Sequence, residues 1–289
     1  MSRRRPSPQE VARFRRDGYV AVARRVVSPR ALRVPRRLLD ALFDRADELP
    51  PSWVHDLAPG SDGGRVPEIV HCAHLEPRLL QCRAYRLALR SARRLLGAKV
   101  KLAFDHAIFK PSGDGAVTAL HQDLAFSPQW DVPTATIWLA LVDATDDNGC
   151  MRFLPSTPEG LLDHEPSGRD GLAAIGLDVS DARPCPVPAG GFTAHSQRAV
   201  HGSGPNRTAQ ARAAWILKFE RDDRSWRRRT WERSLELQGV AVPRRFRHLV
   251  EAFAPVTSAR GPVHTGPGPA RADQQEGSAQ RLPSGDQRA

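Results

Sequence analysis

The sequence predicts a mainly β fold, a sandwich or barrel, with helices flanking it on the N-terminal side. Short β-prone runs alternate with turn residues between positions 99 and 220, which is typical of such sheets. Before them, "ALRVPRRLLDALFDRADEL" and "PRLLQCRAYRLALRSARRLLG" carry apolar residues at helical spacing. Hydrophobic residues make up 40% of the 289 positions, which is enough for a substantial core.

The N-terminal part begins with a clear helix signal. The stretch "SPQE" at residues 7–10 supplies a capping serine, a first-turn proline and a glutamate that can complete a capping box. This helix is expected to stop at Gly18, and the run "YVAVA" predicts a short strand after it. Ser28–Pro29 opens a second helix by the same logic, with Pro35 as a point where it can kink.

The expected secondary structure changes twice in the middle of the chain. Residues 51–70 are rich in proline and glycine and are expected to form a loop. Residues 77–97 are expected to form one helix that stops at Gly97. The β-prone runs that follow are "KVKLAFDHAIFK", "AVTALHQDLAF", "TATIWLALVDA", "CMRFLP", "GGFTAHSQ", "RAVHG" and "RAAWILKFE".

These patterns predict a single domain at residues 1–254, followed by a tail. The domain comprises a helical part at about 1–98, a β core at about 99–220 and closing helices at 222–253. Residues 255–289 are rich in Pro, Gly, Gln and Arg and have almost no large apolar side chains, so this tail is expected to be disordered.

Charge and cysteine content narrow the class of protein. The chain has 43 Lys+Arg against 32 Asp+Glu, a formal net charge of +11, which could serve an anionic partner. The arginines are dispersed and no aromatic-interleaved RNA-binding pattern accompanies them, so a nucleic-acid partner is not expected. The four cysteines form no CxxC pair, which fits neither a zinc knuckle nor a disulfide framework and favours a reducing compartment.

No part of the sequence has the pattern of a membrane segment. No apolar run approaches the roughly 18 residues that a membrane span needs. The basic N-terminus is not followed by an uninterrupted apolar stretch, so no signal peptide is expected. These features predict a cytoplasmic protein, and they leave its oligomeric state open.

The stretch "LHQDLAF" places a histidine and an aspartate two residues apart in an apolar run. On a strand, residues i and i+2 share one face, so His121 and Asp123 would lie about 6–7 Å apart at the backbone and could converge on one metal ion. "RAVHGSGPN" offers His201 as a third ligand near the end of another β-like run. Two histidines and one carboxylate form a facial triad, which suits non-haem Fe(II) and leaves positions open for a bidentate co-substrate and O2.

A 2-oxo acid co-substrate also needs a cation for its distal carboxylate. Arg212 lies eleven residues after His201, with apolar neighbours in "AAWIL" that favour an inward position. A guanidinium matches a carboxylate in a bidentate manner. If the intervening turn folds back antiparallel, Arg212 stands on the strand adjacent to His201, and Ser203 can add a hydroxyl to the same carboxylate.

Several motifs together resemble the phytanoyl-CoA dioxygenase family of Fe(II)/2-oxoglutarate-dependent oxygenases. They are "LHQDLAF", "DNGCMRFLPST" and "VPAGGFTAHSQRAVHGSGPN" followed by Arg212, with a weaker match of "QEVARFRRDGYVAV" to the family's N-terminal helix and strand. The resemblance runs from about residue 9 to about residue 220. It implies a double-stranded β-helix, a distorted jelly roll, which agrees with the strand pattern.

The resemblance also implies roles for individual residues. His121, Asp123 and His201 match the family's metal ligands, with Fe(II) as the metal and 2-oxoglutarate and O2 as co-substrates. The residues that it places near the co-substrate are Arg212, Ser203, Trp138 and His106. Halogenating relatives have a small residue in place of the acidic ligand, so the presence of Asp123 favours hydroxylation or a related oxidation of a small molecule.

Other readings of these residues remain open at this point. His195 is a rival distal ligand, His164 is expected in a loop and Lys110 in a structural role. Residues Trp53, His71 and His74 lie before the β core and could form a lid over the substrate. The Arg-rich, Lys-poor composition favours a bacterial secondary-metabolite substrate. Alternatives to the oxygenase are a metal-binding jelly roll without turnover, a zinc hydrolase using the same ligands, which would not need Arg212, and a nucleic-acid demethylase.

Overall fold

The computed structural model describes residues 5–57, 66–113, 116–128, 131–155, 159–167 and 171–222. The chain divides into two units, residues 1–258 and 259–289, and every described residue lies in the first. The closing helices expected at 222–253, apart from Asp222, and the tail expected at 255–289 fall outside the described residues.

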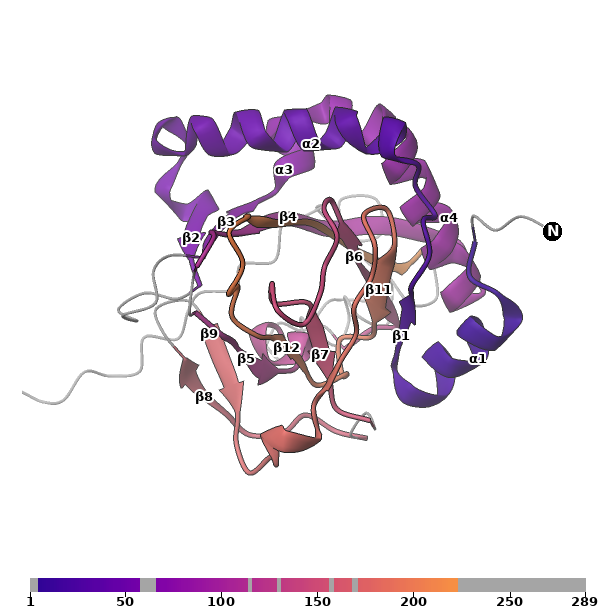
Figure 1. Ribbon diagram of the computed structural model, residues 1–289. Helices are drawn as coiled ribbons and strands as arrows, with labels where there is room; N and C mark the ends of the chain where they lie inside the picture. Colours follow the sequence, from indigo (N-terminus) through magenta and orange to yellow (C-terminus); the bar gives the residue numbers. More distant parts are fainter. Residues whose placement is uncertain are drawn as a thin grey trace, which may run out of the picture. The chain divides into compact units, whose positions relative to one another are not determined.

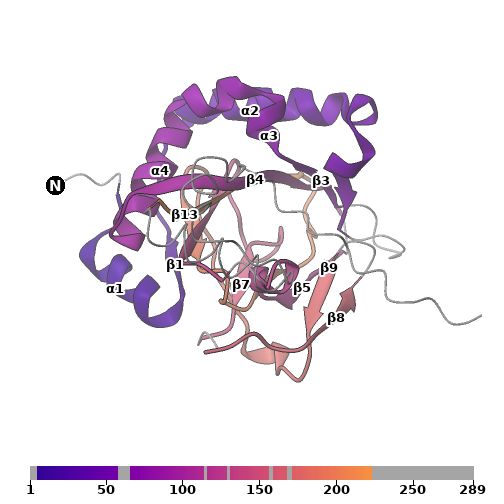
Figure 2. The same ribbon diagram turned by 180° about the vertical axis from the view of Figure 1, so that it is seen from behind.

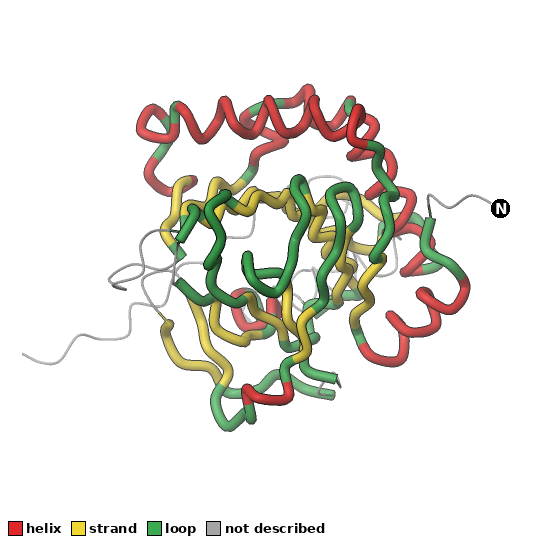
Figure 3. Tube along the Cα trace, in the orientation of Figure 1, coloured by secondary structure: helices red, strands yellow, loops and turns green. Residues whose placement is uncertain are grey.

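Two antiparallel sheets form the body of the described fold (Figures 1 and 3). The larger sheet has the order β1 (Tyr19–Val22), β11 (Phe192–His195), β6 (Thr134–Ala140), β13 (Arg212–Arg221), β4 (Val100–Lys110), β3 (Pro67–Val70), β2 (Val54–Asp56). The smaller sheet has the order β10 (Arg183–Pro184), β7 (Met151–Phe153), β12 (His201–Ser203), β5 (Thr118–His121). A separate hairpin pairs β8 (His164–Ser167) with β9 (Gly171–Ala174). This arrangement confirms the predicted jelly roll.

Helices cover one face of the seven-stranded sheet, and the four-stranded sheet lies on the other side, as Figures 1 and 2 show from opposite directions. The helices are α1 (Pro8–Asp17), α2 (Pro29–Asp44), α3 (Cys72–Leu75) and α4 (Arg83–Leu96). Short 3-10 turns are η1 (Ala46–Glu48), η2 (Pro51–Trp53), η3 (Pro77–Gln81), η4 (Asp123–Phe126) and η5 (Val179–Asp181).

The start and stop of α1 follow the predicted signals. Ser7 Oγ accepts a hydrogen bond from the Glu10 amide at 3.2 Å, and the Glu10 carboxylate accepts one from the Ser7 amide at 2.6 Å, which forms the capping box. Gly18 ends the helix with φ of 75°, a left-handed conformation that glycine adopts without strain. At α2 the logic holds only in part, because Ser28 makes no side-chain cap bond, and the helix continues through Pro35.

Alternation along the central strands separates two cores. On β13, Trp215, Leu217 and Phe219 are fully buried against the helices. The intervening Ala214 and Ile216 face the four-stranded sheet, in a second apolar cluster with the buried aromatic rings of that side. The interior between the two sheets is therefore lined by the even-numbered positions of β13 and by their cross-strand partners.

Two expectations for the middle of the chain were wrong. Residues 51–70, expected as a loop, contain the short strands β2 and β3, and β3 gains its backbone partners from β4, which is distant in sequence. The helix expected over residues 77–97 is interrupted at Cys82, whose backbone is extended (φ −74°, ψ 158°). Its Sγ accepts a hydrogen bond from the Tyr85 amide at 3.4 Å, so Cys82 caps a new helix.

The pairing of β12 with β5 requires glycine at position 202. A Cβ at Gly202 would lie 2.5 Å from the Thr118 carbonyl oxygen, which belongs to the neighbouring strand. We therefore expect Gly202→Ala to lower the free energy of unfolding by about 1–3 kcal/mol, as over-packing typically does.

Urea unfolding followed by circular dichroism measures this change. Gly160→Ala serves as the matched control, because a Cβ at Gly160 meets nothing within 4 Å. The control is expected to stay within about 0.5 kcal/mol of the parent. Equal stability of the two variants would show that the two strands can separate to admit a methyl group.

Candidate metal centre and co-substrate pocket

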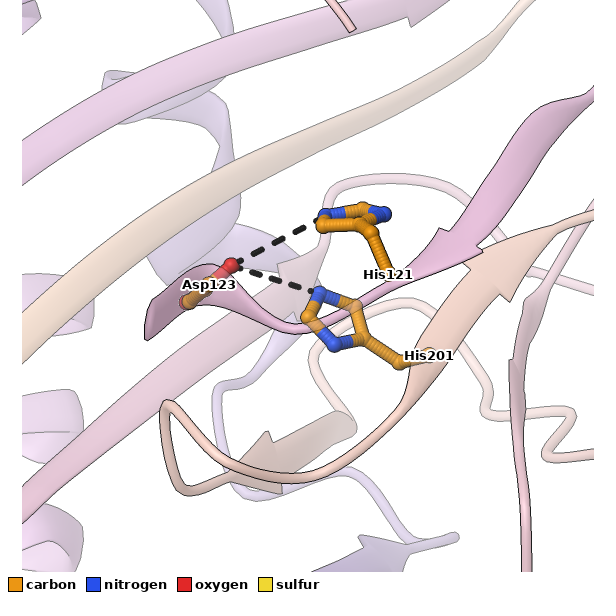
Figure 4. Close-up of side chains that lie close together, drawn as sticks. All are labelled: His121, Asp123 and His201. Carbon is orange, nitrogen blue, oxygen red and sulfur yellow. Dashed lines mark ion pairs between the residues drawn. The ribbon is translucent and has the colours of Figure 1, made fainter. Parts of the chain in front are cut away.

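His121 and Asp123 do not share a strand face, contrary to the prediction from their spacing. Strand β5 ends at His121, and Asp123 begins the turn η4. The turn redirects the chain so that Asp123 Oδ1 still lies 3.9 Å from His121 Nε2 (Figure 4). The convergence therefore depends on a change of backbone conformation between the two residues, and not on the alternation of a strand.

His201 stands directly opposite His121. It is the first residue of β12, where the prediction placed it near the end of a run, and it pairs with His121 in the antiparallel register. Its Nε2 lies 3.5 Å from Asp123 Oδ1. One candidate ligand atom from each of the three residues lies within 4.8 Å of the others, and Figure 4 shows their side chains pointing toward one another.

Backbone carbonyls hold both imidazoles in one tautomer. Nδ1 of His121 lies 2.9 Å from the Ala119 oxygen, and Nδ1 of His201 lies 2.9 Å from the Ala199 oxygen, so each Nδ1–H donates to the carbonyl two residues back. Each Nε2 lone pair is then left for a metal. Burial, with a smaller contribution from neighbouring histidines, lowers the pKa of both rings to about 4, so both are neutral at neutral pH, as ligation requires.

The second oxygen of Asp123 is held on the side away from the two imidazoles. Thr136 Oγ1 donates to Asp123 Oδ2 at 3.2 Å, and His195 Nε2 lies 3.6 Å from the same oxygen. Burial alone would raise the pKa of Asp123, but its interactions with His195, His201 and Lys218 outweigh this effect and hold the pKa well below its usual range. The carboxylate is therefore ionised, with Oδ1 turned toward the two imidazoles.

His195, the rival distal ligand, is not part of the three-residue group. It is 2% exposed, and neither of its ring nitrogens has a hydrogen-bond partner within the part of the chain that the structure describes. Its position on β11, opposite Thr136, places it behind the carboxylate of Asp123. The donor set that fits a metal is two imidazole nitrogens and one carboxylate oxygen, which suits Fe(II) in a facial triad.

Gln122, between the two ligands of the HxD motif, anchors this segment. Its side chain is fully buried and donates to the carbonyls of Gly160 at 3.1 Å and Arg198 at 2.8 Å. Its Oε1 accepts from the Leu162 amide at 2.8 Å. Its own amide donates to His164 Nε2 at 3.1 Å, so His164, expected in a loop, lies at the start of β8 and acts as a hydrogen-bond acceptor. The sequence signal for Gln122 was a long polar residue inside an apolar run.

Arg212 lies in the other sheet from His201, and the predicted hairpin between them is wrong. It begins β13, opposite Lys110 of β4, whereas His201 belongs to the four-stranded sheet. The connection at residues 204–211 crosses from one sheet to the other. Asn206 fixes this crossing, because its amide donates to the carbonyls of Lys110 at 3.1 Å and Pro111 at 2.8 Å.

The guanidinium of Arg212 is buried without an acceptor. Arg212 is 1% exposed, and its guanidinium carbon lies 5.1 Å from the centre of the Trp138 ring. Its Nε and Nη1 atoms have no hydrogen-bond partner among the described residues. Burial lowers its pKa to about 10, so it stays charged at neutral pH. A buried cation with unused donors on an aromatic face fits a carboxylate ligand.

The remaining predicted pocket residues lie on the same interior. Ser203 is buried and its Oγ donates to Thr118 Oγ1 at 3.1 Å. Lys110 is fully buried and its ammonium donates to the carbonyls of Ala116 at 3.0 Å and Ser203 at 3.4 Å. His106, on β4 opposite Ile216, has its Nδ1 against the Glu68 carboxylate. The roles of these residues toward a co-substrate stay predictions.

Comparison with known proteins agrees with this geometry. A family model described as phytanoyl-CoA dioxygenase (PhyH) matches residues 14–214. The chain belongs to the phytanoyl-CoA dioxygenase family. It is 30% identical over 140 residues, 45% of the chain and 49% of the relative, to a probable alpha-ketoglutarate-dependent hypophosphite dioxygenase of Stutzerimonas stutzeri. It is 32% identical over 126 residues, 40% of the chain and 45% of the relative, to a phytanoyl-CoA dioxygenase domain-containing protein 1 homolog of Dictyostelium discoideum.

The chain spans about half the length of the curated relatives that it matches. Among solved structures, EvdO2 from Micromonospora carbonacea var. aurantiaca, complexed with 2-oxoglutarate, is similar with a TM-score of 0.63 and 26% identity over 75% of this chain and 91% of that one. The carbocyclase SnoK from nogalamycin biosynthesis shares the fold, with a TM-score of 0.60 and 21% identity over 77% of this chain and 87% of that one. In the part of the present chain that the structure describes, no helix is long and apolar enough to cross a membrane.

The anchoring of Gln122 has a measurable consequence for metal binding. Gln122→Glu replaces the amide that donates to two carbonyls with a carboxylate that would face them, so His121 and Asp123 should lose their fixed placement. We expect the affinity for Fe(II) to fall about 10- to 100-fold, as for other changes next to metal ligands.

Anaerobic competition with a chelator measures that affinity. Gln210→Glu makes the same chemical change at an exposed position and should leave Fe(II) affinity unchanged. An unaltered affinity in Gln122→Glu would mean that the HxD segment holds its ligands without this anchor.

Proposed function

We propose that this chain is an Fe(II)/2-oxoglutarate-dependent dioxygenase that hydroxylates or otherwise oxidises a small molecule. The observation that carries the proposal is the unpartnered, fully buried guanidinium of Arg212, in the same interior as the His121–Asp123–His201 group. Membership of the phytanoyl-CoA dioxygenase family supports it, as does the 2-oxoglutarate complex of EvdO2.

His121, Asp123 and His201 would hold the iron. Their two neutral imidazoles and one carboxylate leave part of the metal's coordination sphere open and lower its positive charge by one. Bound iron supplies the redox chemistry that couples conversion of 2-oxoglutarate to succinate and carbon dioxide with oxidation of the substrate by O2. Thr136 would keep Asp123 from turning its second oxygen toward the metal, which preserves the open positions.

Arg212 would bind the distal carboxylate of 2-oxoglutarate. Trp138 fixes the plane of the guanidinium, so its donors are oriented before the co-substrate arrives. Ser203 would add a hydroxyl beside that carboxylate, and the buried charge of Lys110 favours an anion at this end of the interior. His106 would face the co-substrate from the neighbouring strand. This pocket favours the oxygenase over a zinc hydrolase, which has no use for Arg212.

The substrate that we propose is a small molecule, with secondary metabolites as the favoured class. We propose a cytoplasmic location because all four cysteines are free, which is typical of a reducing compartment. A nucleic-acid partner is not proposed, because the arginines are dispersed along the sequence. The alternative is a jelly roll that binds metal without turnover. The following measurement distinguishes it from an oxygenase.

Formation of succinate tests the proposal directly. The protein, incubated with Fe(II), ascorbate, 2-oxoglutarate and O2, is expected to release succinate slowly without substrate and faster with it. His201→Ala should abolish this activity and Fe(II) binding, because only two of the three protein ligands would remain. Lys99→Ala, at an exposed position outside the metal group, should retain both.

Metal content and product distinguish the oxygenase from a metal-binding protein and from a zinc hydrolase in the same assay. Tight binding of iron without any succinate would support a binding protein. Activity with zinc that needs no 2-oxoglutarate would support a hydrolase, and either result would contradict the oxygenase.

Substitutions at Arg212 test the co-substrate pocket. Arg212→Met removes the charge, and we expect the KM for 2-oxoglutarate to rise about 100-fold, in keeping with the cost of about 3 kcal/mol for losing a charge-assisted hydrogen-bonded pair. Arg212→Lys keeps the charge but loses the planar fork, so an intermediate rise is expected.

Arg207→Met, at an exposed position, is the matched control and should leave the KM unchanged. Fe(II) affinity should be the same in all of these variants, since Arg212 contacts no metal ligand. A KM that is indifferent to Arg212→Met would place the co-substrate elsewhere.

A further inference from the structure

One row of side chains crosses the seven-stranded sheet beside the metal group. The register places His195 of β11 opposite Thr136 of β6, Thr136 opposite Lys218 of β13, and Lys218 opposite Phe104 of β4. Thr136 contacts Asp123, so the whole row faces the metal group from this sheet. The sheet therefore presents a lysine and an aromatic ring next to the position of the iron.

Lys218 brings a positive charge to this row, and that charge acts on the carboxylate of Asp123. It is half-buried and lies between Leu217 and Phe219, which face the helices, so its own side chain points to the interior. Within the described part of the chain it forms no ion pair. The neighbouring carboxylate on the same strand, Glu220, is already paired with Lys101 at 2.7 Å.

Binding of a metal would take up the carboxylate on which Lys218 acts. That carboxylate belongs to Asp123, which is one of the three proposed metal ligands. Lys218 would then carry a charge that no carboxylate of the described residues pairs with, and such a charge is costly in partly buried surroundings.

Aromatic rings continue from this row toward the surface. The ring of Phe104 meets that of His71 edge-on at 5.1 Å, and the ring of Trp53 lies 5.4 Å from His71 and 5.3 Å from His74. His71 is held in a left-handed conformation with φ of 56°, which is uncommon outside glycine and often marks a functional site. These rings form an aromatic wall that begins beside Lys218.

We propose that the substrate is an organic anion whose single negative charge is bound by Lys218 and whose flat, apolar body packs against Phe104 and the adjoining rings. This inference rests on the proposed oxygenase function and specifies the substrate class of that same site. Lys218 orients the molecule by its charge, and the ring wall holds the carbon skeleton beside the metal.

Benzoate and its neutral isostere benzamide are suitable probes. Their binding to the full chain is measured by calorimetry under nitrogen, after saturation with Fe(II) and 2-oxoglutarate, so that excess co-substrate keeps the probe away from Arg212. We expect benzoate to bind at least tenfold more tightly than benzamide. Lys218→Met should abolish this preference, Lys218→Arg should retain it, and Phe104→Leu should weaken both probes alike.

Lys99→Met is the matched control, because Lys99 is an exposed lysine outside this row. It should leave the preference intact. Circular dichroism and the preceding titration with 2-oxoglutarate show that each variant is folded and loaded. Failure of 2-oxoglutarate to bind the parent would contradict the proposed function itself. If 2-oxoglutarate binds, equal affinity for the two probes, absence of binding by both, or a preference that survives Lys218→Met would overturn this inference alone.

Discussion

The pairing of β12 with β5 is the constraint on which the site depends. It sets His201 opposite His121, and these two residues sit where one strand begins and the other ends. Beyond that point neither chain continues the ladder in regular form, so both imidazoles can turn toward the turn that carries Asp123. Gly202 permits the close approach of the strands, because its missing side chain leaves room for the Thr118 carbonyl. A metal group made from one register and one turn therefore needs few residues.

The two sheets contribute different residues to the site. The smaller sheet supplies the histidines, while the larger sheet supplies the guanidinium of Arg212 and the side chains around Asp123. The helices stabilise the larger sheet from outside, where its buried Trp215 also donates to Asp105 at 2.9 Å. The interior face of that sheet is therefore free to carry polar and charged groups, since its packing energy is gained on the opposite face. This separation explains how the sheet can carry the buried guanidinium of Arg212 on its interior face.

Sequence reasoning identified what is encoded locally and missed what depends on contacts between distant segments. The capping box at Ser7 and the stop at Gly18 could be predicted, because neighbouring residues alone determine them. The hairpin expected between His201 and Arg212 was wrong, because Asn206 fixes a crossing between sheets by bonding to the end of β4, which no local pattern indicates. Thr136 was missed because a threonine in a β-prone run has no signal beyond strand propensity. Lys218 was missed for a related reason, since its meaning comes from the register with Thr136 and from the lack of a partner.

The polar interior carries a cost that its ligands can offset. Buried nitrogens of Arg212 and His195 have no hydrogen-bond partner among the described residues, so their burial is costly. Ligands that satisfy such groups stabilise the folded chain by an amount that grows with their affinity and concentration. The folded protein is therefore less stable without a ligand than it would be with apolar side chains at these positions. The same buried charge also makes the site selective. An anion gains the pairing that the protein withholds, whereas a neutral molecule of equal shape leaves the buried charge uncompensated.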